Sequence, residues 1–190
     1  MKKYKLYKNV SDDFMYVYSP VCKVYKEFIV EDDCVHNSFN EEIDDWDYIS
    51  IVTKEKYTYG VTLKTKCAFE KFGAPLIVFT DDIFEGKDGK PTYGHHFEIV
   101  AYEEGINVWS IVPWWERTER PIKSTRIGFL EFPVDANALV ELEVKIEKGK
   151  ITATLCGKTV EVYDSSIPEK FHVGVTACEG VNKFTEFVID

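Results

Sequence analysis

The chain of 190 residues suits one large β-sandwich, and its length does not call for a second domain. Hydrophobic residues make up 45% of it, which excludes disorder over most of the chain. The 33 acidic and 23 basic residues leave a formal net charge of −10, and no local basic patch offsets it. Nucleic acid is therefore excluded as an expected partner, and we expect a single domain over residues 1–190.

The first eight residues alternate lysines with tyrosine and leucine, a pattern typical of an edge strand that faces solvent. No apolar stretch follows them to form a signal peptide, and no run reaches membrane-spanning length. The five cysteines lie far apart and are odd in number, which favours reduced thiols over a disulfide framework. These features predict a cytoplasmic protein with no membrane partner.

Along the chain, the acidic segment 31–46 is irregular, and we expect a loop with a short strand near 34–39. Alternating apolar residues from Tyr57 to Cys67 then predict a strand with one buried face. The continuous apolar run Pro75–Thr80 is typical of a strand that is covered on both faces. Segments 81–91 and 113–126 are expected to be loops.

Two antiparallel units are predicted downstream. Segments 94–102 and 106–112 flank a Glu-Glu-Gly turn and indicate a hairpin, and alternation over 140–162 with two Gly-containing turns indicates a three-strand meander. We also expect Val173–Ala177 to pair with Phe184–Val188 across the turn at 179–182. About a dozen short strands predict an all-β fold, a two-sheet antiparallel β-sandwich.

Residues 55–190 resemble the concanavalin A-like lectin/glucanase superfamily, which includes laminin-G-like and glycoside-hydrolase-associated jelly rolls. The resemblance rests on the aromatic-rich strand Tyr93–Ile99, the segment bearing Trp109, the meander and the closing strand Phe184–Ile189. Cys156-Gly-Lys replaces the family's usual Asn-Gly-Lys turn. The resemblance implies a concanavalin A-like jelly roll, whose members bind or cleave carbohydrate on the concave face of the larger sheet, or serve as interaction modules.

The segment Glu98–Glu103 resembles the Glu-Ile-Asp-x-x-Glu motif of retaining glucanases in this superfamily. The resemblance implies that Glu98 is the nucleophile and Glu103 the general acid. Retaining chemistry places the two carboxyl groups about 5–5.5 Å apart. Residues five apart on a regular strand face opposite sides, so this spacing requires a bulge. Val100 stands where the family has an Asp, which favours the alternative of a strand with a polar face.

Trp114 and Trp115 are the leading candidates for sugar binding, because aromatic faces stack on pyranose rings and rim loops concentrate binding residues. Arg117 beside them is a candidate for hydrogen bonds to hydroxyl groups. On an extended segment one tryptophan faces the core and the other solvent, and the alternative is that both cover the sandwich edge. Trp109 falls on an apolar alternation and is expected in the core.

Tyr93 and His96 complete the predicted sugar-binding face. His96 and Glu98 are two apart and share one side of the strand, although a purely structural histidine is the alternative. His95 faces the opposite way, so the two histidines are not expected to chelate one metal.

Three acidic clusters raise the question of Ca²⁺, which relatives bind through loop carboxylates. The clusters are Asp32-Asp33, Asp44-Asp45 with Asp47, and Asp81-Asp82. None has the spacing of an EF-hand loop, so solvated loops are favoured and no metal or other cofactor is predicted. The cysteines form no recognisable motif with histidine.

The sequence therefore predicts a lectin-like domain that binds an oligosaccharide or glycan on an aromatic and acidic face. Two alternatives stay open: a glycoside hydrolase that uses Glu98 and Glu103, and a non-catalytic protein-interaction module.

Overall fold

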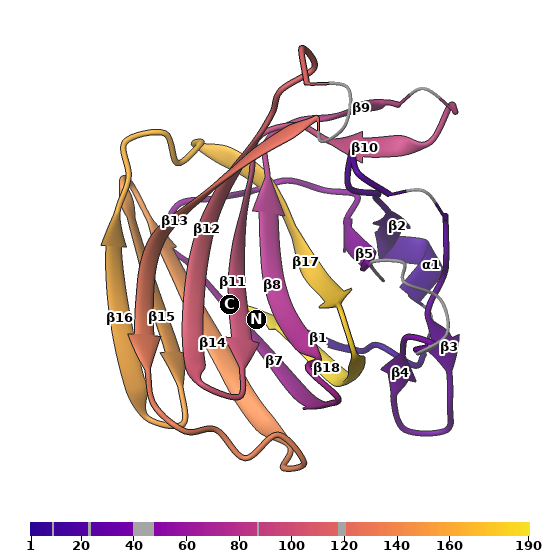
Figure 1. Ribbon diagram of the computed structural model, residues 1–190, viewed down its shortest axis with the longest axis vertical. Coiled ribbons are helices and arrows are strands. Elements are labelled where there is room, and N and C mark those ends of the chain that lie inside the picture. Colours follow the sequence, from indigo (N-terminus) through magenta and orange to yellow (C-terminus); the bar gives the residue numbers. More distant parts are fainter. Residues whose placement is uncertain (9, 23, 40–47, 87, 118–120) are drawn as a thin grey trace.

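The computed structural model describes the chain except residues 9, 23, 40–47, 87 and 118–120. Two large antiparallel sheets pack face to face, and the paired strands β1 and β18 bring the chain ends together (Figure 1). The predicted all-β, two-sheet antiparallel β-sandwich is confirmed. No helix among the described residues is long and apolar enough to span a membrane.

Sheet A contains, in spatial order, β16 (Lys158–Tyr163), β15 (Lys150–Leu155), β14 (Val140–Glu147), β7 (Val61–Glu70), β18 (Val181–Ile189), β4 (Val35–His36) and β3 (Ile29–Val30), with β1 (Lys2–Lys5) paired to β18. Sheet B contains β13 (Ile122–Glu131), β12 (Gly105–Pro113), β11 (His96–Tyr102), β8 (Ala74–Thr80), β17 (Lys170–Cys178), β5 (Tyr48–Thr53) and β2 (Phe14–Tyr16), with β6 (Tyr57–Thr58) paired to β17. The short elements α1 (Val10–Asp13), β9 (Ile83–Glu85) and β10 (Pro91–Tyr93) lie outside both sheets.

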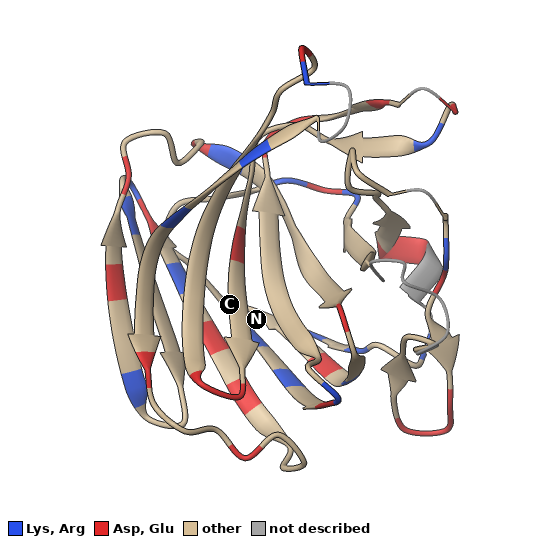
Figure 2. Ribbon diagram, in the orientation of Figure 1, with Lys and Arg blue, Asp and Glu red and all other residues tan. Residues whose placement is uncertain are grey.

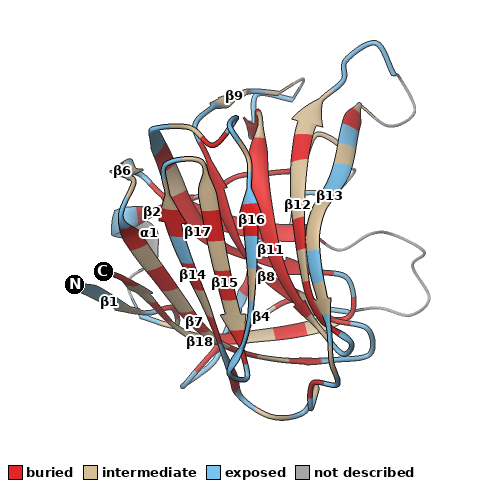
Figure 3. Cartoon of the chain, turned by 90° about the vertical axis from the view of Figure 1, so that its left-hand side faces the viewer, coloured by how far each residue is buried: buried red, intermediate tan, exposed pale blue. Residues whose placement is uncertain are grey.

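The main core lies between the sheets and follows from the period-two sequence pattern. Along β7, β14 and β15 buried residues alternate with more exposed ones, whereas β8 and β11 are buried almost throughout (Figure 3). Phe79 and Phe97 stack at the centre with ring centroids 4.8 Å apart, and Phe171 packs against Phe79. Burying each large apolar side chain stabilises the fold by about 1.5–3 kcal/mol before chain entropy is subtracted.

The predicted meander, the β11–β12 hairpin and the doubly covered strand β8 are all confirmed. The predicted pairing of 173–177 with 184–188 is wrong. β17 pairs with β8 and β5 in sheet B, whereas β18 pairs with β7 and β4 in sheet A. At the turn that contains Glu179 and Gly180, both with positive φ angles, the chain passes from sheet B to sheet A.

Two predicted loops are shorter than expected. Segment 81–91 contains β9 and the first residue of β10, and β13 already begins at Ile122 within the predicted loop 113–126. Segment 31–46 holds β4, as expected near residues 34–39, and its last seven residues lie outside the described part. β4, β9 and β10 have only two or three residues each, which is too few alternations to be recognised in a sequence.

Two half-buried histidines, His95 just before β11 and His172 on β17, are expected to make stability depend on pH. Burial lowers the pKa of both His95 and His172, and His172 Nδ1 lies 2.8 Å from the Thr53 carbonyl oxygen. A lowered folded-state pKa gives stability that is complete above the unfolded value of about 6.5 and is lost as pH falls through the folded value. We expect the urea midpoint to drop between about pH 7.5 and 5.5, and to drop less in His172→Gln. If the urea midpoint fell equally in the wild type and in His172→Gln, groups other than His172 would cause the pH dependence.

Candidate functional site

The outer face of sheet B, which points away from sheet A, is covered over one half. Val17 donates a backbone hydrogen bond to Ser50 on β5, and a second apolar cluster forms beneath residues 17–22. This cluster includes Val17, Tyr48, Val52, Leu76, Val78, Tyr93, Val100 and Cys178. The N-terminal segment therefore occupies the β5 side of the face, and the β11–β12 side stays accessible.

A groove of about 390 Å³ lies on the accessible side of this face. Side chains of β8, β11, β12 and β13 form its floor, and the turn 70–73 after β7 forms one wall. Its apolar lining includes Phe72, Ala74, Leu76, Val100, Trp109 and Ile111, and its polar lining includes Glu70, Glu98, Tyr102, Glu103, Asn107, Ser124 and Glu179. Figure 2 shows that β8, β11 and β12 are free of charged residues except for one acidic band on β11, which is Glu98.

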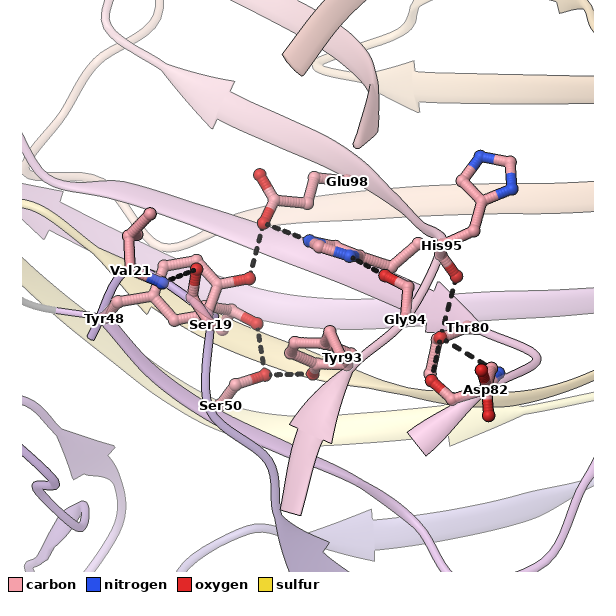
Figure 4. A network of polar contacts seen from close by, with 12 residues as sticks. Ser19, Val21, Tyr48, Ser50, Thr80, Asp82, Tyr93, Gly94, His95 and Glu98 are labelled. Carbon is pink, nitrogen blue, oxygen red and sulfur yellow. Dashed lines mark hydrogen bonds and ion pairs between the residues drawn. The ribbon is translucent and has the colours of Figure 1, made fainter. Parts of the chain in front are cut away.

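Glu98 is the best-supported polar group in this groove. Its side chain is 91% buried, and Tyr48 Oη donates a hydrogen bond of 2.5 Å to Oε1. His96 Nε2 lies 3.5 Å from the same oxygen, and the other carboxylate oxygen points away from both partners (Figure 4). Burial and the adjacent Glu98 raise the pKa of Tyr48 well above its usual value, so the phenol stays protonated and keeps donating.

Tyr93 and His96 lie beneath the site and are almost completely buried. The prediction that they contact a ligand directly therefore does not fit their positions. His96 Nδ1 lies 2.9 Å from the Gly94 carbonyl oxygen, and its ring stacks on Tyr93 with centroids 4.6 Å apart. The Tyr93 hydroxyl lies 2.5 Å from Ser50 Oγ (Figure 4). These contacts fix the rings that hold Glu98.

Trp109 differs from its predicted position because it lines the groove. It was expected in the core, yet it is half-buried, lies outside the inter-sheet core and lines the groove. Its Cα is the register partner of Glu98 across the β11–β12 pair. The alternation that placed Trp109 with Ile111 was real, but both residues face the outer side of sheet B.

The predicted rim residues Trp114, Trp115 and Arg117 follow the end of β12. The tryptophans are 40% and 52% exposed, so the expectation that one of them enters the core is wrong. Trp115 makes an edge contact with Phe84 at 5.2 Å, and the Arg117 guanidinium lies 5.5 Å from the Trp114 ring centroid. None of these three residues lines the groove, so the structure does not bring them together with Glu98.

Glu103 lines the groove with Glu98 but lies in the turn between β11 and β12. The required bulge is absent from His96–Tyr102, a strand that the structure describes in full, because its register with both neighbours is continuous. The four strand positions from Glu98 to Tyr102 already span about 13 Å, and Glu103 follows them in the turn. The geometry therefore gives no support to a retaining pair at about 5–5.5 Å. Val100, at the position of the family's Asp, belongs to the second apolar cluster beneath residues 17–22.

Within the part of the chain that the structure describes, Asp32-Asp33 and Asp81-Asp82 do not form a common group of potential metal ligands. Asp44, Asp45 and Asp47 lie outside the described residues. The backbone carbonyl of Asp82 accepts hydrogen bonds from Gly94 and Thr80, as part of a turn. Among the described residues, one group of potential metal ligands was found, and it includes Asp33.

No protein-family model matches the sequence, and no curated protein matches it either. Solved structures do match the fold. The carbohydrate-binding module CBM66 from Bacillus subtilis aligns with a TM-score of 0.61 at 10% identity, covering 88% of this chain and 99% of the module. The concanavalin A-like jelly roll is confirmed. An inactivated β-agarase B in complex with agaro-octaose aligns at 0.67 with 7% identity, covering 95% of this chain and 85% of the agarase.

A third match is LamAcat from Zobellia galactanivorans, with a TM-score of 0.59 and 10% identity, covering all of this chain and 95% of that one. At such low identities these likenesses establish the jelly roll alone.

Proposed function

We propose that this jelly roll binds a neutral oligosaccharide in the groove over β11 and β12. One observation carries the proposal: the buried carboxylate Glu98, fixed by Tyr48 and His96, lies opposite the half-buried Trp109 on the floor of an open groove. An aromatic platform beside a few fixed polar groups is the usual make-up of a small-molecule site.

The polar groups of the groove suit the hydroxyl groups of a sugar. One Glu98 oxygen accepts from Tyr48, and the other is directed away from its protein partners. Asn107 Oδ1 is a buried acceptor that lines the same groove and has no hydrogen-bond partner among the described residues. Buried acceptors are normally satisfied, so ligand hydroxyl groups that donate to both oxygens would complete the site.

The charge of the groove favours an uncharged ligand over an anionic one. Four glutamates line it, against one basic residue, Lys71. The Lys71 ammonium lies 5.7 Å from the centroid of the Phe39 ring, and Glu70 forms an ion pair with Lys183 at 3.7 Å. The negative charges of the glutamates weaken the binding of an anionic ligand by repulsion, and salt screens this repulsion. We therefore expect sulfated or uronate glycans to bind more weakly than neutral ones of the same linkage, with a difference that shrinks as salt is added.

A glycan array tests the proposal directly, with neutral, sulfated and uronate oligosaccharides displayed side by side. Binding of one neutral class, confirmed by calorimetry with the free oligosaccharide, is the expected result. An absence of binding across the array would overturn the proposal and leave the protein-interaction alternative. Release of reducing ends from a bound oligosaccharide would instead support the glycoside hydrolase alternative.

The cytoplasmic location stays a prediction. None of the five cysteines, all within the described residues, forms a disulfide, which agrees with a reducing environment.

A further inference from the structure

The hairpin formed by β3 and β4 gathers side chains of three metal-binding types, none of which lines the groove. One ligand atom from each of Glu31, Asp33 and Cys34 lies within 4.8 Å of the other two. Cys34 Sγ lies 3.5 Å from Glu31 Oε2, and His36 Nε2 lies 3.2 Å from Glu31 Oε1. The sequence spacing gave no sign of this site, because the four residues fit no standard cysteine and histidine motif.

His36 supports the cluster through Glu31. Its Nε2 lies 3.2 Å from Glu31 Oε1, and its Nδ1 lies 3.0 Å from the Asn37 carbonyl oxygen. The imidazole therefore orients the Glu31 carboxylate and is itself held by the backbone. Partners of this kind behind a ligating carboxylate are common in metal sites.

The hairpin is fixed to the sandwich directly beside the cluster. The Asn37 side chain donates to the Gly180 carbonyl oxygen and accepts from the Asn182 backbone, both at 2.7 Å. β4 also pairs with β18 at His36 and Val35. A rigid support of this kind is what holds ligands near a binding geometry.

We propose that this hairpin binds Zn²⁺, with Cys34, Glu31 and Asp33 as ligands and His36 as the partner that orients Glu31. A thiolate beside carboxylates suits Zn²⁺, whereas Ca²⁺ and Mg²⁺ prefer oxygen alone. In tetrahedral zinc sites, neighbouring ligand atoms are about 3.2–3.6 Å apart. The distance of 3.5 Å between Cys34 Sγ and Glu31 Oε2 already falls in that range.

The role of the ion would be to fasten the edge of sheet A. β3 and β4 have only two residues each, and so short a hairpin has little stability of its own. A metal that binds the folded state stabilises it by mass action. Zn²⁺ is therefore expected to raise the thermal midpoint of the protein.

The test is a Zn²⁺ titration of chelator-treated protein against a chromophoric chelator. We expect one equivalent to bind, and affinity to fall at least about tenfold in Asp33→Asn and in Cys34→Ser. Asp32→Asn in the same hairpin and Cys156→Ser at an exposed turn are the matched controls and should bind as the wild type does. Co²⁺ should give a thiolate charge-transfer band that disappears in Cys34→Ser.

Three results would overturn the proposal. They are no Zn²⁺ binding, binding that survives both ligand substitutions, and a Co²⁺ complex without the thiolate band. Because Cys34 is buried, its serine variant can lose stability, and the exposed Asp33 then decides the outcome. The groove does not contain these residues, so this result is independent of sugar binding.

Discussion

Trp109→Ala is expected to weaken binding of the neutral oligosaccharide by at least about tenfold, which corresponds to a loss of about 1.4 kcal/mol. The indole is the largest aromatic surface on the groove floor, and it lies next to the only charged residue of β11. Its removal takes away both the stacking platform and the apolar wall beside Glu98. Calorimetry with the oligosaccharide identified on the array measures the effect.

The matched control is Trp115→Ala, which deletes the same side chain at the rim. Trp115 does not line the groove, and its ring makes an edge contact with Phe84. We expect its affinity to stay within about twofold of the wild type, because exposed single contacts contribute little. Loss of binding in Trp115→Ala with retention in Trp109→Ala would move the site to the rim. Trp109 also packs against the second apolar cluster beneath residues 17–22, so its removal can lower stability. Unfolding curves of both variants therefore distinguish lost binding from lost stability.

The fold was predictable because alternation is a local signal. From Val140 to Ile146, the polarity of each residue indicates whether its side chain faces the core or solvent. This prediction needs no knowledge of the paired strand β7 or of the other sheet. The pairing of strands is a different matter, as β17 and β18 show. Their sequences fit a hairpin equally well, and only the burial of β17 on both faces requires it to lie inside sheet B.

Only part of the candidate site was predictable, because alternation is a local signal. Alternation correctly put His96 and Glu98 on one face, but it does not say which face is later covered. Residues 17–22 cover the β5 side of that face, so Tyr93 is buried beneath the site, whereas the half-buried Trp109 still lines the groove. Tyr48 could not be linked to Glu98 at all, because the hydrogen bond joins residues 50 positions apart.

Gly174→Ala is expected to destabilise the protein by about 3 kcal/mol, near the upper end for overpacking, because the obstacle is backbone. A Cβ at this position would lie 1.8 Å from the Ile51 carbonyl oxygen and 2.7 Å from the Val52 Cα. β5 and β17 would have to separate at their pairing of Val52 with Gly174. The urea midpoint, measured with an unchanged m-value, reports the loss.

Gly174→Ala is also expected to affect the groove. β5 carries Tyr48, whose hydroxyl holds Glu98, so a displaced β5 should also weaken sugar binding under conditions where the variant is still folded. Gly157→Ala is the control: nothing lies within 4 Å of its Cβ, and its φ of +72° costs about 1–2 kcal/mol in strain. An effect of Gly174→Ala no larger than this control would show that β5 and β17 are less closely packed than the structure has them. Reduced sugar affinity in Gly174→Ala alone would show that the geometry of Glu98 depends on the covered half of sheet B.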